Sequence, residues 1–73
     1  MTLLDLYKVC TDIQIIRIYI NDDAYASNKP IGVYRIDGIC EERYDTWILH
    51  ILPGYSKELD EYVLDVVIDI STW

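Results

Sequence analysis

The sequence feature that most constrains the fold is a regular alternation of side chains near the end of the chain. Apolar residues occupy every second position there, which is typical of a β-strand that turns one face toward a hydrophobic core. Because the chain has only 73 residues, it can build one core, and we expect a single domain over residues 1–73. The apolar positions are Tyr62, Leu64, Val66, Ile68 and Ile70, and they alternate with Val63, Asp65, Val67 and Asp69.

Two further segments have the composition of buried strands. Residues 13–20 are rich in β-branched side chains and contain only Gln14 and Arg17 as polar residues, which predicts a central strand buried on most of both faces. Residues 46–52 are apolar apart from His50. Their periodicity leaves open a strand or a short helix, and their aromatic and β-branched content favours the strand.

The remaining strands are expected from turn signals. Asp37-Gly38 lies between two isoleucines and predicts a two-residue hairpin turn, because such a turn requires positive φ at both central positions. We therefore expect residues 31–36 to pair with residues 39–44. The polar composition of residues 21–30 predicts a loop.

A second turn signal follows at Pro53-Gly54, a pair that suits a type II turn. After it, Ser56 is placed to cap a single helical turn that runs through Glu58 and Glu61.

At the start of the chain, Thr2 and Asp5 have the spacing of a capping box, and apolar residues then recur at helical intervals. A short amphipathic helix over residues 3–10 is predicted, and it must pack on other elements because it is too short to be stable alone. The fold class that follows is α+β, with a short N-terminal helix packed on a four- to five-stranded, mainly antiparallel sheet.

The charge of the chain restricts its partners. Thirteen acidic and six basic residues give a net charge of −7. We therefore expect no direct binding to nucleic acid and none to an anionic membrane, because both need clustered Lys and Arg. No apolar run is long enough to span a membrane, no leader pattern is seen, and Cys10 and Cys40 are expected to be reduced in the cytoplasm. A basic surface on another protein is the expected partner.

No catalytic constellation is evident. The chain has no nucleophile elbow, no phosphate-binding glycine loop and no zinc motif, so we expect no enzyme activity, no catalytic residue and no cofactor. His50 is the only histidine and is interpreted as a core or interface residue. Asp22, Asp23 and Asp37 lack the spacing of a calcium loop, so no metal site is predicted.

Tyrosines and carboxylates supply the candidate binding residues instead. The carboxylates gather in three groups, which we call the first, second and third acidic clusters. An acidic surface often serves only to keep a small protein soluble. Carboxylates on a rigid surface can also imitate the phosphates of a nucleic acid in a basic groove. The first cluster is Asp22 and Asp23, the second is Glu41, Glu42 and Asp45, and the third is Glu58, Asp60 and Glu61; Tyr25, Tyr44 and Tyr55 lie beside them.

Three segments, Thr2–Leu6, Ile15–Tyr19 and Leu59–Asp69, resemble a loose group of small acidic proteins encoded by phages and mobile elements of Firmicutes. The resemblance covers the two ends, about half of the chain, and carries over no functional residue. Some small acidic phage proteins inhibit bacterial defence, including anti-CRISPR proteins. The resemblance implies a non-enzymatic inhibitor that binds a host protein, and the acidic clusters favour nucleic-acid mimicry as its mode of binding. The alternative is a small dimerisation or regulatory interaction module without mimicry.

Overall fold

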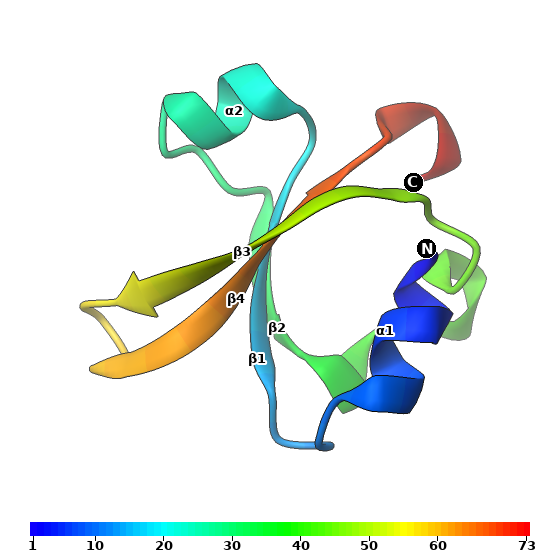
Figure 1. Cartoon of the computed structure of the whole chain (residues 1–73), viewed down its shortest axis with the longest axis horizontal. Helices are drawn as coiled ribbons and strands as arrows, with labels where there is room; N and C mark the ends of the chain where they lie inside the picture. Colours follow the sequence, from blue (N-terminus) through cyan, green and yellow to red (C-terminus); the bar gives the residue numbers. More distant parts are fainter.

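A computed structural model describes residues 1–73 as one mixed four-stranded sheet with two short helices (Figure 1). The strand order is β2-β1-β4-β3, in which β1 and β4 are parallel and the two outer pairings are antiparallel. The α+β class is confirmed. The sheet, expected to have four to five strands and to be mainly antiparallel, has four strands and a parallel pair at its centre. The elements are α1 (Leu3–Val9), β1 (Ile15–Tyr19), α2 (Asp22–Ala26), β2 (Gly32–Arg35), η1 (Ile36–Gly38), η2 (Glu41–Arg43), β3 (Ile48–Ser56), β4 (Glu61–Ile68) and η3 (Ile70–Thr72).

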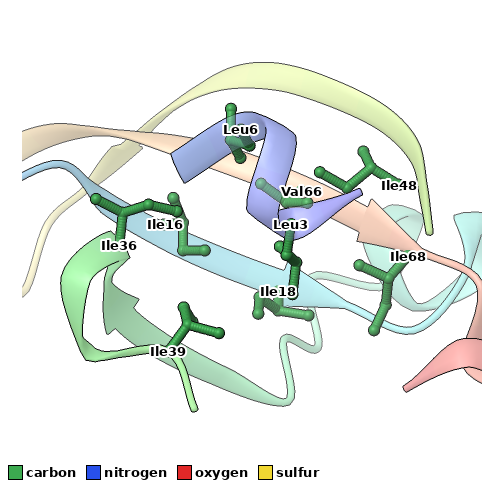
Figure 2. Packing of buried hydrophobic residues seen from close by; sticks show 9 residues of the cluster. All are labelled: Leu3, Leu6, Ile16, Ile18, Ile36, Ile39, Ile48, Val66 and Ile68. Atoms are coloured by element: carbon green, nitrogen blue, oxygen red, sulfur yellow. The ribbon is translucent and has the colours of Figure 1, made fainter. Parts of the chain in front are cut away.

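Helix α1 begins at the predicted capping box. The Asp5 N–H donates to Thr2 Oγ1 at 3.3 Å, and the Thr2 N–H donates to Asp5 Oδ2 at 2.9 Å. The helix buries Leu3 and Leu6 against one face of the sheet, which we call the core face. Neither helix of the fold has the length and apolarity needed to cross a membrane. Figure 2 shows the core cluster, which consists of Leu3, Leu6, Ile16, Ile18, Ile36, Ile39, Ile48, Val66 and Ile68.

Strands β1 and β4 form the centre of the sheet, as their composition predicts. Ile16 and Ile18 of β1 face the core, and the opposite side of β4 is buried as well, because Val63 and Val67 are almost fully covered. The alternation in β4 predicted one buried face, but the strand has two. Asp65 lies on this second face of the sheet, between the two valines.

The predicted hairpin at Asp37-Gly38 is wrong. Gly38 does not adopt positive φ, and Ile36–Gly38 form a 3-10 turn. This turn allows Ile36 and Ile39 both to enter the core cluster. Strand β2 pairs with β1 instead, and the segment expected as its partner, residues 39–44, contains η2 rather than a strand.

The turn predicted at Pro53-Gly54 is also wrong, because β3 continues through both residues. Strand β3 lies at the edge of the sheet, where a proline is tolerated because its missing N–H removes no ladder bond. The strand assignment for residues 46–52 is confirmed over Ile48–Leu52. The chain reverses after Ser56, whose Oγ accepts from the Leu59 N–H at 3.2 Å, so this serine stabilises a hairpin turn and not a helical one.

Part of the predicted loop at residues 21–30 forms helix α2. The Asn21 side chain accepts the Ala24 N–H at 2.8 Å, and Asp22 and Asp23 occupy the first helical turn. Carboxylates in a first turn interact favourably with the helix dipole. The Asn-Asp-Asp run therefore begins a helix, and a loop follows it to β2.

Candidate partner-binding surface

Arg17 of β1 and Asp65 of β4 form an ion pair on the second face of the sheet. Arg17 Nε lies 2.7 Å from Asp65 Oδ1, and Arg17 Nη2 lies 3.1 Å from Asp65 Oδ2. The hydrogen bond to Asp65 raises the pKa of Arg17. Gly54 of β3 faces this pair, and a Cβ there would lie 2.8 Å from Arg17 Nη2 and would also meet the Asp65 carboxylate. The absent side chain of Gly54 therefore makes room for the ion pair.

A groove of about 440 Å³ lies beside the ion pair. Arg17 is part of its lining, Asn28 and Pro30 form one side, and Lys57 and Glu58 of the β3–β4 turn form the other. The lining carries both charge signs and few apolar groups. It thus offers hydrogen-bonding and charged groups to a partner, in contrast to the apolar pockets that hold most small ligands.

The first acidic cluster lies at the start of α2. Tyr25 of this helix packs edge-on against Tyr19, with ring centroids 5.1 Å apart. Burial raises the pKa of Tyr19, which is almost fully covered. Asp22 Oδ1 lies 3.3 Å from His50 Nε2 of β3, whereas Asp23 has no ion-pair partner. The helix therefore places both carboxylates in its exposed first turn, with Asp22 beside His50 of β3.

The third acidic cluster lies on the β3–β4 turn, at the far end of β3. The Tyr55 hydroxyl donates to the Asp60 carboxylate, and this hydrogen bond raises the pKa of Tyr55. Tyr55 also packs against Tyr62, with ring centroids 5.3 Å apart. Asp60 has φ of 53°, in the left-handed region. Glu58, Asp60 and Glu61 are all exposed.

The second acidic cluster is separated from the other two. Glu41 and Glu42 belong to η2, and the Leu4 N–H donates to the Tyr44 carbonyl, so this segment lies beside the start of α1. Figure 1 shows it on the side of the molecule away from the β3–β4 turn. Tyr44 packs against Tyr7, and desolvation raises its pKa. Its ring is therefore part of the packing around the core and is less free to bind a partner.

The basic side chains leave the three clusters largely unpaired. Arg17 is paired with Asp65, and Arg35 with Asp37. Arg43 lies over the Trp73 ring, 3.9 Å from its centroid, and donates to the Trp73 carbonyl at 2.5 Å. No three His, Cys, Asp or Glu side chains come together in a way that would hold a metal ion.

Sequence reasoning missed the groove, and with it Arg17, Asn28 and Lys57. In the sequence, Arg17 stands out only as a polar residue in a buried strand. Such a residue signals a buried partner charge, which Asp65 supplies from the other alternating strand. Asn28 and Lys57 come from the loop before β2 and from the β3–β4 turn, and we find no signal in the sequence that these two segments line the same groove.

Comparison with known proteins gives no relative. No protein family, no curated protein and no solved structure matches the chain.

Proposed function

We propose that the chain is a non-enzymatic protein that binds a basic surface of another protein. In its concrete form it inhibits a bacterial defence protein in the host cytoplasm, as an anti-CRISPR protein does. The observation that supports this proposal is the state of the clustered carboxylates. Only Asp22 among them has an ion-pair partner, and that partner is a histidine. The others are exposed and present an uncompensated negative field, to which a basic surface is complementary.

We assign the binding surface to the first and third clusters. Asp22 contacts His50 near the start of β3, and Glu58, Asp60 and Glu61 lie in or beside the turn that follows β3, so the two groups flank the same strand. Carboxylates separated along a rigid scaffold are the arrangement that imitation of a phosphate backbone needs. The second cluster lies beside the start of α1 and is assigned no role in binding.

Capture from a bacterial lysate tests the proposal. A third-cluster variant (Glu58→Gln, Asp60→Asn, Glu61→Gln) and a second-cluster variant (Glu41→Gln, Glu42→Gln, Asp45→Asn) each remove three charges from the net −7. Asparagine also tolerates the left-handed backbone at position 60. Mass spectrometry should find the same basic protein with the wild type and the second-cluster variant, and much less of it with the third-cluster variant.

Two outcomes would contradict the proposal in different ways. Equal losses with both variants would show that total charge matters and that the assigned surface is wrong. Full capture by both variants, at low salt as well as at high salt, would show that the carboxylates do not mediate binding.

A further inference from the structure

The free edge of β3 is the longest unpaired backbone segment of the sheet. Strand β3 is outermost in the strand order, and the opposite edge strand, β2, has only four residues. The chain covers just the start of the β3 edge. There the Ile48 N–H donates to the Met1 carbonyl at 2.8 Å, and Thr2 forms an isolated antiparallel β-bridge with Trp47.

The pairing register shows which backbone groups of β3 point away from β4. Ile48 points its N–H outward, and it pairs with Ile68. A bulge between Ile48 and His50 inserts one extra residue into β3. Beyond the bulge, Ile51, Pro53 and Tyr55 pair with Val66, Leu64 and Tyr62, which are every second residue of β4 counted back from Ile68. These three residues of β3 therefore share the outward direction of Ile48. Pro53 has no N–H, so two N–H groups and three carbonyls form the free edge.

The side chains along this edge are apolar and uncharged at neutral pH. Ile51 is 39% exposed and Tyr55 is 43% exposed, and the neighbouring Tyr62 of β4 is 82% exposed. From Ile48 to Ser56 the only titratable side chain besides that of Tyr55 is His50, in a chain whose net charge is −7. Such an edge favours a partner strand whose alternate side chains are apolar.

Charge at the two ends of β3 decides between possible partners. Asp22 reaches one end through His50, and the third acidic cluster flanks the other end. A second copy of this chain, pairing β3 with β3, would bring acidic groups together at both ends. A different polypeptide with basic residues at both ends of its strand would meet opposite charges.

We propose that the β3 edge binds an extended segment of the partner protein as a fifth strand, with apolar alternate side chains and Lys or Arg at both ends. This inference rests on the proposed function and specifies the partner's chemistry. Pro53 and the bulge restrict pairing, as such features do on natural edge strands. They leave Ile51 and Tyr55 as the two donors, so the partner strand must fit this pattern.

A peptide titration of the intact protein, followed by two-dimensional NMR at low salt, tests the proposal. The probe is a capped peptide of about nine residues, the length of β3, in which valine alternates with threonine and lysine occupies both ends. We expect shifts along β3 and amide hydrogen exchange at Ile51 and Tyr55 slowed about tenfold or more at saturation. The same peptide with glutamate at both ends should bind at least about tenfold more weakly, because its charges repel the flanking clusters.

Two controls separate strand pairing from other contacts. N-methylation of the peptide at alternate amides should abolish binding if those amides pair with β3. Ile51→Pro removes one outward donor without removing a bond to β4, and it should weaken binding, whereas Ile51→Thr retains the donor and should bind nearly as the wild type does. Equal binding of the N-methylated peptides, or no shifts along β3, would overturn the proposal.

Failure of this inference is distinguishable from failure of the proposed function. If the protein captured from lysate binds Ile51→Pro as tightly as wild type but loses the third-cluster variant, strand addition is overturned and the acidic surface stands. If both variants bind it as the wild type does, both proposals fail. If sedimentation shows a concentration-dependent dimer, and amide hydrogen exchange at Ile51 and Tyr55 slows with protein concentration in the absence of peptide, the occupant of the edge is a second copy and the proposal is wrong.

Discussion

At the scale of single residues, Gly54 is required by a close approach and not by a turn. Its backbone continues β3 and does not have positive φ, yet a side chain there would collide with the ion pair beneath it. Gly38, which its sequence context indicates as an essential turn residue, faces open space, and a Cβ added there would meet no atom within 4 Å. Sequence context indicates both glycines as turn residues, but in the structure only Gly54 is required, and the reason is the ion pair that it faces.

We predict that Gly54→Ala lowers the free energy of unfolding by about 1 to 3 kcal/mol, because a methyl group must displace Asp65 or Arg17. Gly38→Ala is the matched control and should change it by less than about 0.5 kcal/mol. Urea denaturation measures both. Equal effects at the two positions would contradict the role given to Gly54.

The ion pair itself gives a second prediction. The Asp65 side chain is only 6% exposed, so Arg17→Met leaves a carboxylate covered without its partner and should cost about 3 kcal/mol of unfolding free energy. The double variant Arg17→Met with Asp65→Leu should recover most of that loss, because it removes both charges together. A double variant no more stable than Arg17→Met would show that packing, and not charge, is responsible.

At the scale of elements, α1 depends on its capping box. Hydrogen bonds from the backbone and side chain of Thr2 hold the pKa of Asp5 below its ordinary value. A carboxyl group whose pKa is lower in the folded state stabilises the fold fully above its unfolded-state pKa, and this stabilisation is lost as the pH falls through the folded-state pKa.

We therefore predict that Asp5→Asn is less stable than wild type at neutral pH, and that the difference shrinks as the pH falls through the Asp5 pKa. Thermal unfolding from neutral pH down to about pH 2 would measure it. Asp12→Asn removes the same charge from a residue with no hydrogen bond to the backbone, and its effect serves as the reference. A stability difference for Asp5→Asn that does not depend on pH would exclude the carboxylate as the stabilising group.

Elements whose pattern reflects local physics were predictable. The capping box defined α1, the β-branched run defined β1, and alternation defined β4. Elements whose structure depends on distant contacts were not. Pro53 can continue a strand only because β3 is an edge, and Asp37-Gly38 does not form a hairpin because burial of Ile36 and Ile39 outweighs the local turn preference.

For the candidate site, the exposure of the carboxylates was predictable from the sequence, but their spatial grouping was not. Exposure of the clustered carboxylates follows from their charge, and all of them lie on the surface. Their grouping does not follow from sequence, because the β3–β4 hairpin and α2 bring the first and third clusters to the two ends of one strand. Tyr44 was a binding candidate by its place in the sequence but packs beside α1.

At the scale of the whole molecule, the fold is flat, with extents of 29 × 27 × 16 Å, and its net charge is −7. So much like charge on a small body favours rapid encounter with a basic partner and disfavours self-association. The core face is covered by α1, whereas the β3 edge and the groove remain open, and both adjoin residues of the first or third cluster.

The measurement that tests the central claim most directly is the association rate with the captured basic protein, recorded for wild type and for both triple variants at two salt concentrations. Raising salt from about 0.1 M to about 1 M shortens the Debye length from about 10 Å to about 3 Å. Wild type and the second-cluster variant should associate fast at low salt and slow markedly at high salt, because electrostatic steering governs encounter. The third-cluster variant should be slow at low salt and respond less. Equal rates and equal salt dependence for all three proteins would contradict the claim that the third acidic cluster forms the binding surface.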